Sequence, residues 1–423
     1  MNKENMLVRN IGLLVNVEKE ENRLRVNGRA MRQLPVVENA ALIVEDGLIK
    51  WYGSELDLPK PQIPYDCEIN AGGGMVIPSF CDSHTHVLFA APREQELFDR
   101  LNGLSYGEIS AKGGGILNSA RKLEMMSDEE LLRDATNRLL QMLRAGTGTV
   151  EIKSGYGLIP AQEIRMLRLI RRLQRELPMT IRATFLGAHA IPGPFRNNPD
   201  LYVDQIIKEM LPQVAEEKLA DFVDVFCEAG FFTVPQTERI LDAANQYGLR
   251  PRIHANQFTH SGAIGCAIRQ GALSVDHLEV MNDEEIAALA LSDTIPVLLP
   301  GCSFFMNAPY PPARRLIDAG LPVALASDYN PGTNPSGNMK FVLSLACLKM
   351  QMSVGEAIQA ATLNGAAALQ LSATHGSIGK GKRADFFITR PMPSLEYIPY
   401  AYTEPMVDGV VLGGELIEDH CFG

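Results

Sequence analysis

The chain has 423 residues, of which 46% are apolar and 21% charged, so it can bury a core and is not intrinsically disordered. The chain has 39 Lys and Arg residues and 50 Asp and Glu residues, which gives a net charge of −11. No basic stripe and no apolar run of about 18 residues occurs, which argues against nucleic-acid binding and a membrane-spanning helix. An anionic small-molecule ligand would need cations within its own site.

The cysteines and the first residues of the chain predict a cytoplasmic protein. The seven cysteines are odd in number and form no CxxC pair, which is typical of reduced thiols. Asn10 and Asn16 interrupt the first apolar stretch, and no small-residue cleavage site follows. A secretory signal is therefore not expected.

The two ends of the chain have the character of short β-strands. In the N-terminal segment, residues 1–74, an apolar hairpin is predicted around Asp46-Gly47. In the C-terminal segment, residues 376–423, short apolar runs are separated by glycine turns. Because neither segment can bury a core alone, we expect them to pair into one small β-sandwich domain.

Between them, residues 75–375 alternate apolar, β-rich runs with amphipathic helical stretches. Capping signals such as Ser127 with Glu130 and a proline at position 160 mark helix starts. Buried strands alternating with helices indicate a parallel sheet, and eight such units predict an α/β fold, a (β/α)8 TIM barrel. The expected strands are Val76–Ser83, Gly148–Lys153, Thr180–Leu186, Phe222–Cys227, Pro251–Ala255, Leu273–His277, Ile295–Pro300 and Leu321–Ser327.

Two histidines one residue apart follow the first expected barrel strand. In Asp82-Ser-His84-Thr-His86, strand alternation directs both imidazoles to one side. The carboxyl ends of barrel strands form the catalytic mouth. His84 and His86 are therefore predicted metal ligands; the alternative is a pair of ordinary surface or core histidines.

Three more of the eight histidines, and one carboxylate, fall at or just beyond later strand ends. These are His189, His254, His277 and Asp328. Two strand-1 histidines, one of the later histidines and Asp328 would make a His3Asp set suited to zinc or iron. Such an ion lowers the pKa of a bound water from about 16 towards about 7.

With this set, the chain resembles the amidohydrolase superfamily and, through longer motifs, its imidazolonepropionase family. Ser154–Leu158 and Asp328–Thr333 are the more specific stretches. The matching segments are residues 82–94, 105–116, 151–158, 185–190, 253–258, 274–279 and 326–333.

The resemblance implies a fold, a reaction and a set of site residues. It implies hydrolysis of the cyclic amide of 4-imidazolone-5-propanoate by a metal-activated water, with one divalent ion per chain, Zn2+ or Fe2+/Fe3+. Carried over by position, the metal ligands are His84, His86, His254 and Asp328. The substrate contacts are Arg93, Tyr156, His189 and Gln257, and the product contacts are Asn330, Gly332 and Thr333.

The chemistry of these residues fits the implied substrate. Arg93 offers a planar fork for a propionate, the alternative being a salt bridge to Glu94 or Glu96. Tyr156 lies in a glycine-flanked loop that can carry its hydroxyl over a ligand. His189 could hydrogen-bond the ring carbonyl. Gly113–Gly115 matches no phosphate-binding pattern and is interpreted as a loop over the barrel mouth.

Proton transfer needs a residue other than Gln257, because an amide cannot take a proton at neutral pH, although some relatives carry Glu there. We expect Asp328 to deprotonate the water and His277 to orient it or polarise the carbonyl, with Glu279 as a candidate partner of His277. Lys153, on the second strand, is expected to be unmodified, which predicts a single metal.

Two alternatives remain open. The same barrel could act on a hydantoin, a dihydropyrimidine or an aminated purine, although Gln257 replaces the acid of a deaminase HxxE motif. A catalytically inactive binding protein is disfavoured, because all four expected metal ligands are present. A homodimer is expected, with the apolar helix Met339–Met350 among the surfaces available.

Overall fold

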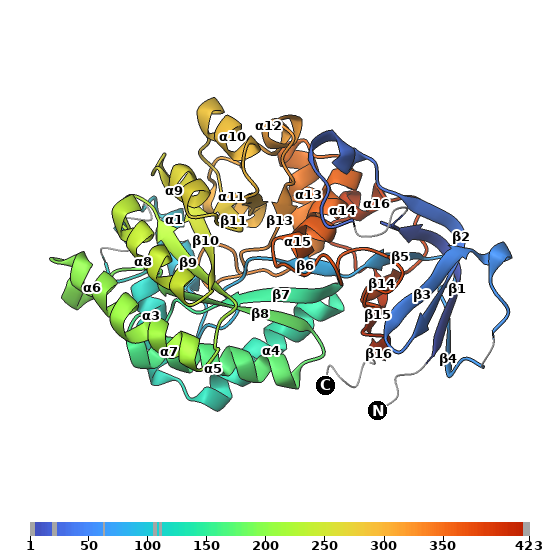
Figure 1. Ribbon diagram of the computed structural model, residues 1–423, viewed down its shortest axis with the longest axis horizontal. Helices are drawn as coiled ribbons and strands as arrows, with labels where there is room; N and C mark the ends of the chain where they lie inside the picture. Colours follow the sequence, from blue (N-terminus) through green and yellow to red (C-terminus); the bar gives the residue numbers. More distant parts are fainter. Residues whose placement is uncertain (1–4, 19–22, 62–63, 105–107, 110–111, 418–423) are drawn as a thin grey trace.

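The computed structural model describes residues 1–423 except 1–4, 19–22, 62–63, 105–107, 110–111 and 418–423. The described residues form two sheets (Figure 1), one of which is a barrel ringed by helices and the other a mixed sheet beside it. Part of the predicted 105–116 motif and Cys421 lie outside the described residues.

Strands from both ends of the chain form the mixed sheet. Its order is β16-β15-β14-β5-β1-β2-β3, with β4 beside β1. The predicted hairpin joins β2 to β3, and Asp46 and Gly47 both have positive φ, as a tight hairpin turn requires. The strands are β1 (Met6–Val15), β2 (Val36–Glu45), β3 (Leu48–Ser54), β4 (Cys67–Asn70), β5 (Met75–Pro78), β14 (Phe386–Thr389), β15 (Val407–Leu412) and β16 (Glu415–Ile417).

This sheet has a main apolar core and a smaller apolar cluster of its own, and it also contacts the barrel. Val8, Leu42 and Phe386 belong to its own core. On the barrel side, the rings of Phe80 and Phe387 lie 5.1 Å apart. Bridges join the N- and C-terminal segments at Val17–Ile378 and Leu48–Arg383, and β5, which the sequence assigned to the barrel segment, pairs with β14.

Eight parallel strands form the barrel, as predicted. A bridge between Thr85 and Tyr329 closes it, as do hydrogen bonds from His86 N–H to Tyr329 O and from Asp328 N–H to His84 O. The strands are β6 (Phe80–Asp82), β7 (Thr147–Lys153), β8 (Thr180–Ala188), β9 (Phe222–Cys227), β10 (Arg250–Ala255), β11 (Ser274–His277), β12 (Ile295–Leu298) and β13 (Ala324–Leu325).

The first expected barrel strand, 76–83, is divided between the two sheets. Its first part is β5, which pairs with β1 and β14, and its second part is β6. At the junction, Ser79 N–H donates to Asp385 O, whereas Phe80 N–H donates to Gly146 O beside the barrel. The prediction of one continuous strand was therefore wrong, because apolar character alone does not show which partner a backbone N–H takes.

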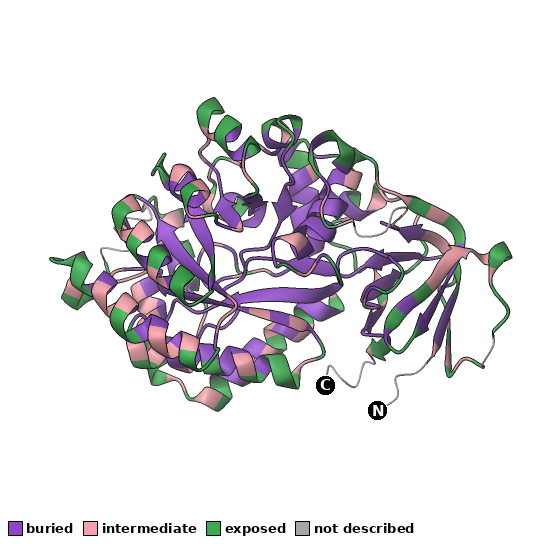
Figure 2. Ribbon diagram, in the orientation of Figure 1, coloured by how far each residue is buried: buried purple, intermediate pink, exposed green. Residues whose placement is uncertain are grey.

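Amphipathic helices cover the barrel, with buried residues inward and exposed residues outward (Figure 2). The capping box at Ser127 and the proline at 160 begin helices as predicted, and Asn282 forms a further capping box. The helices are α1 (Glu94–Leu101), α3 (Ile116–Met125), α4 (Asp128–Arg144), α5 (Pro160–Glu176), α6 (Pro199–Gln205), α7 (Leu211–Glu216), α8 (Val234–Gln246), α9 (Ala263–Arg269), α10 (Asp283–Ala290), α11 (Pro300–Met306), α12 (Ala313–Asp318), α13 (Met339–Met350), α14 (Val354–Ala361), α15 (Leu363–Ala367) and α16 (Tyr397–Tyr400).

Two absences are observed within the described part of the chain. None of its helices is long and apolar enough to cross a membrane. Its six cysteines are all free thiols.

Candidate active site

The predicted metal ligands meet at the carboxyl end of the barrel. His84 and His86 follow β6, His254 lies on β10 and Asp328 follows β13. His86 Nε2 lies 3.4 Å from His254 Nε2, and Asp328 Oδ1 lies 3.7 Å from His84 Nε2 and 3.6 Å from His86 Nε2. All four side chains are buried.

Contacts on the far side of two rings direct their free nitrogens into the site. His84 Nδ1 hydrogen-bonds Asp276 Oδ2 at 2.6 Å, and His254 Nδ1 lies 3.0 Å from Asp224 Oδ2. A carboxylate can only accept, so each Nδ1 carries the proton and each Nε2 presents a lone pair. This carboxylate–histidine arrangement is typical of metal ligands.

The residues fit a divalent cation. Burial lowers the pKa of His84 and His86 well below the ordinary value and also lowers that of His254. His84 Nε2 is buried and accepts no hydrogen bond from any described residue. Three neutral imidazole nitrogens and one carboxylate within a few ångströms form a donor set suited to zinc or iron.

A buried ionic cluster lies below these ligands, inside the barrel. We call Glu151, Lys153, Asp224, Arg252 and Asp276 the floor cluster; each is at most 1% exposed. Lys153 Nζ lies 2.6 Å from Glu151 Oε1 and 2.8 Å from Asp224 Oδ2, and Arg252 Nη2 lies 3.0 Å from Asp276 Oδ2. Buried charges are tolerated only when paired in this way.

The carboxylates of the floor cluster determine whether the Lys153 side chain stays a charged ammonium. Burial alone would lower the pKa of this ammonium, but Asp224 and Glu151 raise it above its ordinary value. A carbamate at Nζ would place a third negative charge between these two carboxylates. The contacts therefore favour the unmodified lysine that the sequence predicts.

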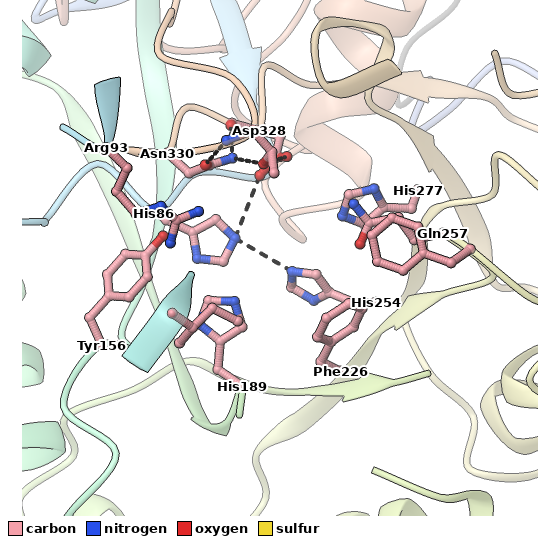
Figure 3. Close-up of a pocket in the computed structure, with 13 residues that line it drawn as sticks. His86, Arg93, Tyr156, His189, Phe226, His254, Gln257, His277, Asp328 and Asn330 are labelled. Carbon is pink, nitrogen blue, oxygen red and sulfur yellow. Dashed lines mark hydrogen bonds and ion pairs between the residues drawn. The ribbon is translucent and has the colours of Figure 1, made fainter. Parts of the chain in front are cut away.

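A pocket opens beside the histidines (Figure 3). Ten of the twelve predicted site residues line it, and His84 and Gly332 are the two that do not. The ten are His86, Arg93, Tyr156, His189, His254, Gln257, His277, Asp328, Asn330 and Thr333.

Arg93 lies in the pocket wall, 5% exposed. Its Nε lies 3.2 Å from Glu96 Oε2 and its Nη1 donates to Ser119, so the predicted alternative, a salt bridge to Glu96, is present as well. A Cβ built on Gly332 would lie 1.7 Å from Arg93 Nη2. The guanidinium thus occupies the space that a side chain at position 332 would need, so a larger residue there would displace Arg93.

Asn330 organises the loop after β13 rather than leaving its amide free. Its Oδ1 accepts from the N–H groups of Gly332 and Thr333 at 2.8 and 2.7 Å. Its Nδ2 donates to Asp328 O at 2.8 Å and to Thr333 Oγ1 at 2.6 Å. These bonds fix Asp328, which has a positive φ of 56°, and Thr333 relative to the pocket.

His189 and Tyr156 form the opposite wall. The ring of His189 stacks on His86 with centroids 5.0 Å apart, and Tyr156 is 2% exposed. His189 Nδ1 lies 2.9 Å from Gly155 O, and burial lowers the pKa of His189 to about 3. The neutral ring therefore donates from Nδ1 to Gly155 O and leaves Nε2 as an acceptor. A substrate carbonyl oxygen is an acceptor too, so it cannot hydrogen-bond Nε2.

A buried carboxylate that the sequence analysis did not identify holds this wall. Glu163, on α5, accepts from the N–H groups of Gly155, Gly157 and Leu158, the last two at 2.7 and 2.8 Å. Burial raises the pKa of Glu163, and these hydrogen bonds oppose that rise. Glu163 therefore positions the loop of Tyr156 and, through Gly155, the ring of His189.

His277 lies on the far side of the metal ligands, at the end of β11. It has a φ of 91°, a strained value for a residue with a side chain. Burial would lower its pKa, but Glu279, with Oε1 3.2 Å from Nδ1, raises the pKa of His277 well above the ordinary value. Gln257 Nε2 lies 3.5 Å from Cys302 Sγ nearby.

The sequence analysis missed the apolar members of the pocket. Ile116, Phe226 and Phe258 line it beside the polar residues. Phe226 lies on β9, one residue from its end, and Phe258 follows β10, so position at the carboxyl end of a barrel strand is the signal that points to both.

The chain is similar to known proteins over most of its length. The Amidohydrolase family profile matches residues 75–417, most of the chain. The chain belongs to the amidohydrolase family. Its relatives include imidazolonepropionases of Christiangramia forsetii and Flavobacterium johnsoniae, each 51% identical over 97% of this chain and 100% or 99% of theirs. That of Caldanaerobacter subterraneus subsp. tengcongensis is 45% identical over 91% of both chains.

Solved structures of other amidohydrolase-type enzymes share the fold. A triazine hydrolase variant superimposes with a TM-score of 0.76 at 16% identity, covering 97% of this chain and 94% of its own. A zinc-bound adenosine deaminase from Xanthomonas campestris gives 0.73 at 16%, covering 99% and 95%. This amidohydrolase is a metal-dependent hydrolase, as the sequence predicted.

Proposed function

We propose that the chain hydrolyses the cyclic amide C–N bond of 4-imidazolone-5-propanoate to N-formimidoyl-L-glutamate, the third step of histidine degradation. The similarity to imidazolonepropionases over nearly the whole chain carries this proposal. The pocket supports it, because a chain of net charge −11 places a buried arginine, Arg93, where a propionate could be bound.

His84, His86, His254 and Asp328 would hold one divalent ion, Zn2+ or Fe2+/Fe3+. When bound, the ion supplies Lewis acidity to a water molecule and to the substrate carbonyl. Asp328 is the one carboxylate among these four buried ligands, so it can accept a proton from a water held beside it. Asp328 is therefore our candidate for the base that deprotonates the attacking water.

The other polar residues orient the substrate around the bond that breaks. The water oxygen bonds to the ring carbonyl carbon, the C–N bond opens, and the water's proton passes through Asp328 to the departing nitrogen. His277, with its raised pKa, can donate a hydrogen bond to the carbonyl oxygen. His189 Nε2 can accept from a ring N–H, which replaces the carbonyl contact expected from the sequence.

The remaining contacts are proposed on the same basis. Tyr156 and Gln257 line the pocket and would hydrogen-bond the ring, and Thr333 would contact the product. Asn330 and Gly332 would act by shaping that loop and by seating Arg93.

A two-metal cyclic-amidase acting on a hydantoin or dihydropyrimidine is the competing proposal. The ion pairs of Lys153 with Glu151 and Asp224 favour one metal, since a bridging carbamate is disfavoured there. The ring that the metal-loaded protein opens distinguishes the two proposals.

The test is a spectroscopic assay of freshly prepared imidazolone propionate with purified protein. We expect turnover by the metal-loaded protein, loss of turnover after chelation, and recovery on adding back Zn2+ or Fe2+. Fully loaded protein that leaves this substrate intact but opens a hydantoin or dihydropyrimidine would refute the proposal in favour of the competing one.

We also propose a homodimer and a cytoplasmic location. Large apolar side chains are exposed on the packed helices α11, α13 and α16 and the turn that follows: Phe304, Leu348, Tyr400 and Tyr402. Such a patch is typical of an interface. Light scattering should give the mass of a dimer for the native chain and of a monomer for Leu348→Glu. Leu291→Glu, at an exposed site elsewhere, should leave the dimer intact. A native chain with the mass of a monomer would refute the dimer.

A further inference from the structure

A second group of metal-binding side chains lies beside the site. It consists of His277 and Glu279, at and just beyond the end of β11, and Cys302 in the first turn of α11. One ligand atom from each lies within 4.8 Å of the others, and all three residues are buried. None of the three is among the four ligands proposed for the catalytic ion.

One oxygen of this group lacks a partner. Glu279 Oε1 contacts His277 Nδ1 at 3.2 Å and accepts from Ser303 Oγ at 3.4 Å. Glu279 Oε2 is buried and has no hydrogen-bond partner among the described residues. An unpartnered buried carboxylate oxygen is costly unless a cation or donor satisfies it.

We infer that His277, Glu279 and Cys302 form a second, weaker site for a thiophilic divalent cation such as Zn2+, Co2+ or Cd2+. One imidazole, one carboxylate and one thiolate form a donor set that these ions accept. Tetrahedral zinc, with bonds of about 2.0–2.3 Å, separates its ligand atoms by roughly 3.3–3.8 Å. Small side-chain rotations would therefore close the group around an ion.

The charges balance for a second ion. Binding releases the Cys302 thiol proton and any proton on His277 to solvent, with no change of oxidation state. The resulting thiolate and Glu279 carry two negative charges against the two positive charges of the ion. Because Cys302 lies within hydrogen-bonding reach of both His277 and Asp328, this ion would lie next to the catalytic one.

An ion here would withdraw His277 from the substrate, so excess metal should inhibit turnover. This consequence rests on the proposed function, but cation binding itself does not. The experiment therefore measures binding, and inhibition is a separate readout.

The experiment titrates chelator-treated full-length protein with Co2+, comparing the native chain with Cys302→Ser. Cys347→Ser, on α13 and outside the group, is the matched control. We expect the native chain and the control to bind two equivalents, with a thiolate-to-cobalt charge-transfer band growing during the second. Cys302→Ser should bind the first equivalent with the native d–d spectrum, lose the band, and lose the second equivalent.

Binding of one equivalent by the native chain, or a charge-transfer band that survives Cys302→Ser, would overturn the inference. Glu279→Gln, which retains the thiol, should weaken the second equivalent at least tenfold without altering the first. An unchanged second affinity in that variant would also count against the site. If the band behaves as expected but imidazolone propionate is not hydrolysed, only the proposed function fails.

Discussion

Asp224 should contribute to both metal affinity and stability, although it cannot reach the pocket. Its Oδ2 lies 3.0 Å from His254 Nδ1 and 2.8 Å from Lys153 Nζ, and its Oδ1 accepts from His254 N–H. Burial raises the pKa of Asp224, but His254 and Lys153 outweigh it and hold the pKa well below its ordinary value. Asp224→Asn keeps the shape and removes the charge.

The magnitude follows from these contacts. Breaking a buried ion pair costs about 3–5 kcal/mol, and we expect about 3 kcal/mol here because Glu151 still neutralises Lys153. A weaker acceptor behind His254 should reduce metal affinity about 10- to 100-fold. Chemical denaturation of the chelated protein measures the first effect, and competition with a chromophoric chelator measures the second.

A neighbouring aspartate provides the control. Asp221, directly before β9, pairs with the part-exposed side chains of Arg171 and Arg182. Asp221→Asn should cost no more than about 1 kcal/mol per pair and leave metal affinity unchanged. Equal losses in the two aspartate variants, with the same metal affinity, would refute the assignment of Asp224 as a positioning residue.

Three further changes test the pocket. Glu163→Gln removes the charge that holds three backbone N–H groups, so it should lower the free energy of unfolding by about 2 kcal/mol and also lower kcat/KM. Native values of both the unfolding free energy and kcat/KM in this variant would contradict the role of Glu163. Gly332→Ala should displace Arg93 and raise KM for the anionic substrate about ten- to hundredfold, whereas Gly193→Ala, where a Cβ meets nothing within 4 Å, should not; equal KM values would argue against a carboxylate at Arg93. His277→Asn should lower kcat at least a hundredfold with the first metal equivalent retained, and undiminished turnover would remove this residue from the mechanism.

The sequence predicted the barrel and most of the pocket because both leave local signals. Eight apolar runs and their capping residues define the strands and helices, and HxH at a strand end places two imidazoles together without knowledge of the fold. The division of 76–83 between two sheets left no such signal, since β5 and β6 differ only in the partners of their backbone N–H groups.

The residues behind the site were harder to predict for another reason. Glu163 lies on a helix whose apolar periodicity it interrupts, and its three acceptor bonds reach a loop that precedes that helix. Asp224 lies within β9, whose other residues are apolar, and Asp276 lies within β11, directly after a buried valine. Their partners come from other strands, so their roles depend on barrel closure and register.

The charges of the floor cluster give an electrostatic reason for one tightly held ion. Three carboxylates and two cations leave this cluster with one net negative charge, and the Asp328 carboxylate adds a second. A single divalent cation among His84, His86 and His254 neutralises both, in a region where an uncompensated charge would be costly. A second ion on these same ligands would be left unbalanced. A second ion can be neutralised only at a place that supplies further negative charge. In this chain that charge comes from the carboxylate of Glu279 and the thiolate that Cys302 can form.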